Sequence, residues 1–185
     1  MTQYFQFIST TRNLWLSFVL TALFVVVIFP YLSAGVESLD VRLDGYSHAE
    51  VMAALEGYGA DGRWRYIWIS LILDAIFPLL YCSLYAGLIY RFAPREALKP
   101  LAYLPLIGGL FDLGENVQIV TMLAQFPEIS VTQVEWANRF TLTKFAFSCL
   151  SMVLAALALC YGVGKWAYEK SRGRPLSGLI KPARR

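Results

Sequence analysis

Four long apolar segments separate the charged residues of this chain, and they constrain its fold more than any other feature. They cover residues 14–34, 66–90, 101–124 and 140–163. Each has about 20 residues or more, the length that an α-helix needs to cross a hydrocarbon layer roughly 30 Å thick. One such segment could be a buried helix of a large soluble protein, but a chain of 185 residues has too little other sequence to surround four. None alternates like a barrel strand, so we predict helices.

These segments predict an all-α fold, a four-helix transmembrane bundle with up-down-up-down topology. We expect one transmembrane domain over residues 1–164, followed by a basic cytoplasmic tail over residues 165–185 that is disordered and rests against anionic headgroups. Between the first two segments, Ser47 and Glu50 have the spacing of a capping box. Apolar residues then recur at helical spacing, which predicts a short amphipathic helix in the first outer loop.

The distribution of Lys and Arg predicts the orientation. Eleven of these residues flank the segments on the side of the two termini, and four lie on the other side. Basic residues are enriched in cytoplasmic loops, so we expect both termini in the cytoplasm and two loops facing outward. The basic tail has no folded basic module beside it, and we therefore expect no nucleic acid as a partner.

Ionisable and amide residues inside the apolar segments are the strongest indication of function. Asp74 lies in the second segment, Asp112, Glu115 and Asn116 lie on one face of the third, and Lys144 lies in the fourth. A charge at the centre of a membrane helix costs about 2.5–3.5 kcal/mol, so such residues nearly always face other helices or a cavity. At 1.5 Å per residue they fall at similar depths in the outer half of the membrane, and we predict that they meet.

Three carboxylates near one lysine leave an excess of negative charge, which a low dielectric does not tolerate. A shared proton, a bound cation, or an arginine from the outer rim such as Arg63 or Arg139 could neutralise it. Tyr81 continues the polar stripe of the second segment below Asp74. Tyr81 and Arg63 therefore join the five residues above as candidates for ligand binding, and no catalytic residue is assigned.

The rest of the sequence excludes several classes of site. The single histidine, His48, lies in a loop, so the chain lacks the ligands of zinc, copper and haem sites and the residues of a Ser-His-Asp triad. No phosphate-binding or dinucleotide-binding motif is present. Cys82, Cys149 and Cys160 lie in the apolar segments, where we expect them to behave as small buried side chains. We assign no metal site, and the cofactor, if any, is unknown.

Four short patterns are shared with a known group of proteins: Gly62-Arg63-x-x-Tyr66, Asp74-x-x-Phe77-Pro78-x-x-Tyr81, Asp112-x-x-Glu115-Asn116 and Thr143-Lys144. In these positions the chain resembles an uncharacterised family of small bacterial four-span membrane proteins. The resemblance implies four spans and marks the same polar positions, but it implies no activity. Separately, we expect the chain to lie in the inner (plasma) membrane, with several passes. In architecture alone, the chain is similar to four-helix membrane proteins that handle lipids and sterols.

Three hypotheses of function follow. The polar cluster could bind a lipid-like or small amphipathic molecule from the outer leaflet; in an enzyme, Asp74 or Glu115 would be the base and Lys144 the electrophilic partner. Alternatively, the protein is a non-catalytic accessory or assembly subunit of a larger membrane complex, with a purely structural cluster. Proton or cation conduction ranks third. A cavity or ligand at the cluster favours the first hypothesis, and direct pairing of lysine with carboxylates favours the second.

Overall fold

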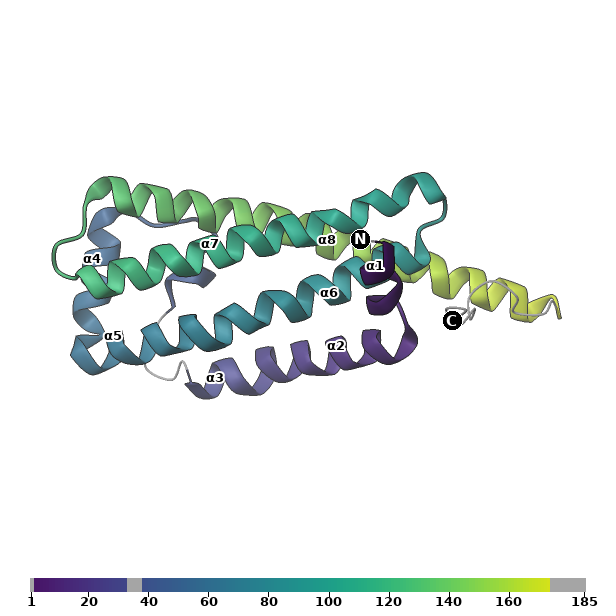
Figure 1. Cartoon of the computed structure of the whole chain (residues 1–185), viewed down its shortest axis with the longest axis horizontal. Helices are drawn as coiled ribbons and strands as arrows, with labels where there is room; N and C mark the ends of the chain where they lie inside the picture. The colour runs from purple at the N-terminus through teal and green to yellow at the C-terminus, as the bar shows by residue number, and fades with distance from the viewer. Residues whose placement is uncertain (1, 33–37, 174–185) are drawn as a thin grey trace.

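The computed structural model describes residues 2–32 and 38–173, and these residues form helices without any β-strand (Figure 1). Short helices that are not α-helical connect or interrupt the α-helices: two π-helical turns (Phe24–Ile28 and Ile69–Leu73) and two 3₁₀ helices (η2, Leu39–Val41, and η4, Glu96–Tyr103). The α-helices are α1 (Thr2–Ile8), α2 (Thr11–Leu23), α3 (Phe29–Leu32), α4 (His48–Gly57), α5 (Gly59–Trp68), α6 (Asp74–Phe92), α7 (Leu104–Gln125) and α8 (Val131–Ser171).

Three continuous helical stretches are long and apolar enough to cross a membrane: Thr11–Leu32, Gly59–Phe92 and Val131–Ser171. They cover the first predicted segment as far as Leu32 and the whole of the second and fourth, so the chain has the character of a multi-pass membrane protein. Helix α7 corresponds to the third segment and has a sufficient length of 22 residues. It is less apolar than the other three because it carries Asp112, Glu115 and Asn116 among its apolar residues.

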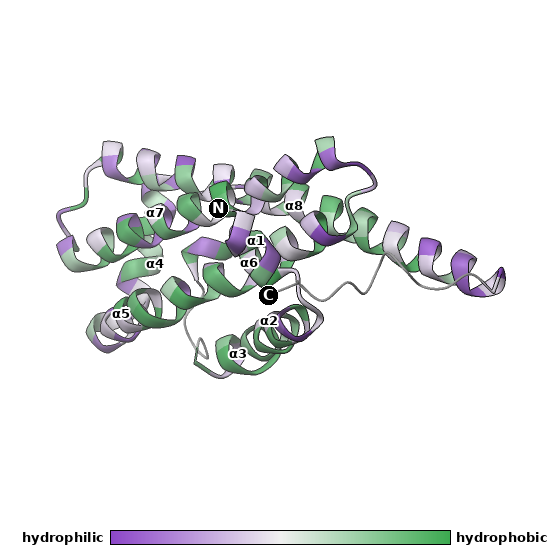
Figure 2. Ribbon diagram, turned by 45° about the vertical axis from the view of Figure 1, so that its right-hand side comes forward, coloured by the Kyte–Doolittle hydropathy of each residue, from purple (hydrophilic) through white to green (hydrophobic). Residues whose placement is uncertain are grey.

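Helices α6, α7 and α8 pack against one another and form the core of the molecule, whereas α2 packs mainly against α6. Figure 1 shows α2 and α3 lying along one side of this core. Most of their residues are coloured as hydrophobic in Figure 2, and side chains such as Trp15, Val26 and Tyr31 are exposed. An exposed apolar surface of this extent suits contact with lipid rather than with water.

The described part of the loop between α3 and α5, residues 38–58, is packed firmly against the core helices; we call it the outer loop after its predicted side. Its helix α4 begins with the predicted capping box: the Ser47 hydroxyl accepts from the Glu50 N–H, and the Glu50 carboxylate accepts from the Ser47 N–H at 2.7 Å. These hydrogen bonds lower the pKa of Glu50. Leu39, Val51 and Leu55 from this loop are fully buried in a hydrophobic cluster with side chains of α5, α7 and α8. The loop therefore covers the outer end of the core.

Two parts of the chain differ from the sequence-based expectations. Helix α8 continues to Ser171, beyond the expected start of the tail at residue 165, and ends before Gly173, whose φ of +62° lies in the left-handed region that favours glycine. Residues 174–185 of the expected tail lie outside the described residues. Of the three cysteines, Cys82 is buried, but Cys149 and Cys160 are exposed on the protein surface. The expectation of burial was therefore wrong for these two, because they lie on outward faces of α8.

Candidate functional site

Lys144 is the centre of the polar cluster. It lies in the first half of α8 and is 7% exposed. Its ammonium group forms an ion pair with Glu115 of α7, and lies 3.7 Å from a carboxylate oxygen of Asp112 on the same helix. It also donates to the backbone carbonyl of Asp40, in the first outer loop, at 3.0 Å. Two core helices and the outer loop therefore converge on one side chain.

Hydroxyl groups hold the two carboxylates that face Lys144. Thr141, one turn before Lys144 on α8, donates to the fully buried Glu115 carboxylate. The hydroxyls of Thr141 and Tyr46 are 3.0 Å apart, and burial in the outer loop raises the pKa of Tyr46 to about 12. On the other side, the Tyr81 hydroxyl of α6 donates to Asp112 at 2.8 Å. A chain of polar contacts thus runs from the outer loop through α8 and α7 to α6.

Asn116 binds a backbone carbonyl of α6 that the sequence of this helix leaves without its usual hydrogen-bond donor. Pro78 lies four residues after Asp74 and has no N–H, so the Asp74 carbonyl lacks its usual helical donor. The side-chain amide of Asn116 donates to this carbonyl at 2.8 Å. Both Asp74 and Asn116 are buried, and an unsatisfied carbonyl at this place would be costly. The amide of Asn116 therefore joins α7 to α6.

Asp74 differs from the other buried carboxylates. It directly follows the π-helical turn Ile69–Leu73, a distortion that occurs frequently at functional sites. Asp74 is 7% exposed and has Asp40 and Asp112 as neighbours. Within residues 2–32 and 38–173, neither a lysine nor an arginine forms an ion pair with it. The buried hydroxyl of Ser70, one turn earlier, lies beside it.

Asp40 is the site residue that sequence reasoning missed. Its carboxylate accepts hydrogen bonds from the hydroxyls of Ser38 and Tyr66, the latter at 2.9 Å, and the Tyr66 oxygen in turn accepts from the Leu39 N–H. Asp40 and Lys144 are 104 positions apart in the chain. No local pattern in a polar loop identifies a carbonyl that will reach an intramembrane lysine.

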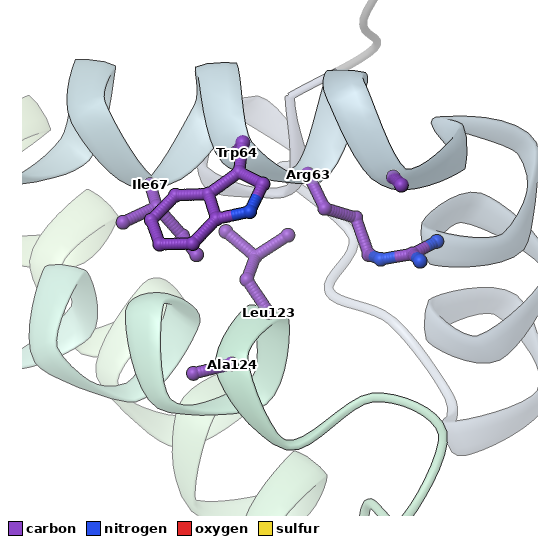
Figure 3. A pocket seen from close by; sticks show the side chains of 6 residues that line it. Arg63, Trp64, Ile67, Leu123 and Ala124 are labelled. Atoms are coloured by element: carbon purple, nitrogen blue, oxygen red, sulfur yellow. The ribbon is translucent and has the colours of Figure 1, made fainter.

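Arg63 lies outside the cluster, although it was a candidate for it. Its guanidinium group donates to the Leu55 carbonyl at 2.9 Å and lies over the Phe126 ring, 4.3 Å from the ring centre. Arg139, the other candidate from the rim, lies over the ring of Trp136. In Figure 3 the guanidinium of Arg63 points away from the indole of Trp64. The side chain lines a shallow hollow of about 230 Å³ between α5 and α7, together with Ala60, Trp64, Ile67, Leu123 and Ala124.

The cluster thus places the carboxylates of Asp112 and Glu115 and the backbone carbonyl of Asp40 at one ammonium group, with the carboxyl groups of Asp40 and Asp74 near it. In the part of the chain that the structure describes, no three of the acidic, histidine or cysteine residues are arranged to hold a metal ion. These groups can form hydrogen bonds to oxygen and nitrogen groups and can transfer protons between carboxyls.

Comparison of the chain with models of protein families, with curated proteins and with solved structures gives no match. The resemblance to small bacterial four-span membrane proteins therefore remains a prediction from the four sequence patterns.

Proposed function

We propose that this integral membrane protein binds a lipid-like or small amphipathic molecule at the cluster around Lys144, with access from the outer leaflet. The observation that supports this most directly is the excess of carboxyl groups. An ion pair that only joins two helices needs one acid and one base, whereas Lys144 has two acids within 4 Å and the carboxyl groups of Asp40 and Asp74 in the same cluster. Ionisable residues inside membrane helices are costly, and their usual role is functional.

The contacts of the outer loop suggest the chemistry of the ligand. Asp40 offers a carbonyl oxygen to Lys144, and the adjacent Leu39 is a fully buried apolar side chain. A molecule that displaces this part of the loop would need an oxygen acceptor for the ammonium group and an apolar portion in place of the leucine. Esters, amides and phosphates with a hydrocarbon chain have both features.

The direct pairing of Lys144 with carboxylates, which was expected to favour a structural cluster, supports a second function. Glu115 is fully buried, one of its oxygens contacts Lys144, and the other accepts from Thr141. Such direct pairing is also expected of a non-catalytic accessory or assembly subunit of a larger membrane complex, in which the cluster only holds the helices together. Buried hydrogen bonds between membrane helices contribute about 0.6–2 kcal/mol each.

Mass spectrometry of bound molecules separates the two functions. The protein is purified in mild detergent, and co-purified lipids are compared between the wild type and the double variant Lys144→Met/Glu115→Gln. This variant removes one positive and one negative charge, so we expect it to fold. Under the first proposal the wild type retains a molecule that the double variant loses. The matched control is Lys99→Met/Glu96→Gln, which removes an exposed pair of the same residue types. Equal retention by wild type and both variants would favour the structural role.

We further propose that α7 is a fourth span, so that the chain forms an up-down-up-down bundle in the inner membrane of a bacterium with both termini in the cytoplasm. In a background without the natural cysteines, an impermeant thiol reagent added to intact cells is expected to label Asp44→Cys and Glu128→Cys. It should label Glu96→Cys and Lys170→Cys only after permeabilisation. If α7 does not cross, the positions on either side of it, Glu96 and Glu128, will label alike.

A further inference from the structure

The two arginines considered as counter-charges for the cluster are bound elsewhere in the structure. The guanidinium groups of Arg63 and Arg139 are engaged at the outer rim, with Leu55, Phe126 and Trp136. Across the described residues, the acidic side chains do not converge as a metal ion requires. Of the three ways in which the charge could be balanced, a bound proton is the one that these contacts leave.

Asp74 is the carboxyl group best placed to carry that proton. Glu115 and Asp112 both have the Lys144 ammonium within 4 Å, so each is stabilised as an anion. Asp74 has no ion pair with a described lysine or arginine, and its carboxyl neighbours, Asp40 and Asp112, repel a second negative charge. A buried carboxylate that lies near like charges and has no direct ion pair is a less stable anion than one in contact with an ammonium group.

Ser70 lies beside the Asp74 carboxyl, and its side chain is buried. A hydroxyl can donate to a carboxylate or accept from a protonated carboxyl, so Ser70 can stay hydrogen-bonded to Asp74 while the proton comes and goes.

We propose that Asp74 is protonated at neutral pH and exchanges its proton with the outer aqueous phase through Asp40. Asp40 is only partly buried and belongs to the outer loop, so it connects the buried acid to the outside. In the exchange, the Asp74 O–H bond breaks and an O–H bond forms on the Asp40 carboxylate, leaving Asp74 as the anion. This proton site does not depend on the proposed ligand and goes beyond it.

Other titratable groups face Asp74 or its neighbours from every element packed around it. They are Tyr66 from α5, Tyr81 and Cys82 from α6, Asp112 and Glu115 from α7, Lys144 from α8, and Asp40 and Tyr46 from the outer loop.

Infrared spectroscopy of the purified protein in lipid nanodiscs tests the proposal directly. The wild type is expected to show the C=O band of a buried protonated carboxyl at neutral pH. Asp74→Asn should abolish the band, and Asp44→Asn, which changes an exposed carboxyl of the same outer loop, should leave it unchanged. If Asp74→Asn is not recovered as folded protein, Asp74→Glu keeps the acid and should move the band. Absence of the band in the wild type, or its persistence unmoved in the Asp74 variants, would overturn the assignment.

Deuterium exchange tests whether the proton of Asp74 leaves through Asp40. After transfer to heavy water, the carboxyl band shifts as the proton is replaced, and Asp40→Asn is expected to slow this shift relative to the wild type. An unchanged rate would show that the proton leaves by another path. Both measurements are made without added ligand, so their outcome is separate from that of the mass spectrometry above.

Discussion

Replacing Lys144 with methionine is expected to lower the free energy of unfolding by about 3–5 kcal/mol, the largest effect that we predict. The substitution keeps the length of the side chain but leaves Glu115 and Asp112 buried without their cation. Removing one member of a buried ion pair costs about this much, because the charge that remains is uncompensated. Thermal and chemical unfolding of the detergent-solubilised protein measures the loss.

Two further variants test whether the loss of stability comes from the broken ion pair. Adding Glu115→Gln to Lys144→Met should restore most of the stability, because removal of both partners of a buried pair is often nearly neutral. Lys99→Met, which breaks the exposed ion pair with Glu96, should change stability by about 0–1 kcal/mol. If Lys144→Met unfolds like the wild type, the ion pair does not form in solution and the cluster is not a unit.

Replacing Asn116 with leucine is expected to destabilise the protein by about 1–3 kcal/mol, the second largest effect. The change keeps the approximate size of the side chain and leaves the Asp74 carbonyl buried without a donor. Thr121→Val is the matched control on the same helix. It removes a hydrogen bond to the Val117 carbonyl, which is part of the regular helix, and should change stability by within about 0.5 kcal/mol.

The role of Pro78 gives this prediction a second test. In Pro78→Ala, residue 78 again has an N–H that can donate to the Asp74 carbonyl four residues earlier. Asn116→Leu should therefore cost clearly less in the Pro78→Ala background than in the wild type. A double-mutant cycle of unfolding free energies measures this coupling. Strictly additive effects would mean that Asn116 acts elsewhere.

The two sets of variants distinguish parts of the cluster that sequence analysis treated alike. Asn116 and Lys144 were both candidates for ligand binding. In the structure the amide of Asn116 is committed to the backbone of α6, whereas Lys144 contacts a loop carbonyl that a ligand could replace. We therefore expect Asn116→Leu to reduce stability while the remaining folded protein retains any bound lipid, and the double variant at Lys144 and Glu115 to lose it.

Local features of the chain were predictable because their causes are local. The long apolar segments form helices because a backbone in lipid has no other partners for its hydrogen bonds. The capping box of Ser47 and Glu50 forms because the two residues lie three positions apart. Asp112, Glu115 and Asn116 share a face of α7 because of the helical repeat, and the cost of burying charge in a membrane predicts that they face inward.

The sequence by itself thus determined the helices, the apolar surface and the inward position of the charged residues. Only the tertiary structure decided the partners: Asp40 reaches Lys144 across 104 positions, Asn116 meets the carbonyl that Pro78 leaves open, and Arg63 stays at the rim with Phe126. The physical reason is that hydrogen bonds and ion pairs act over a few ångströms. Which groups come that close depends on how the helices and the outer loop pack, and no local pattern in the chain encodes that packing.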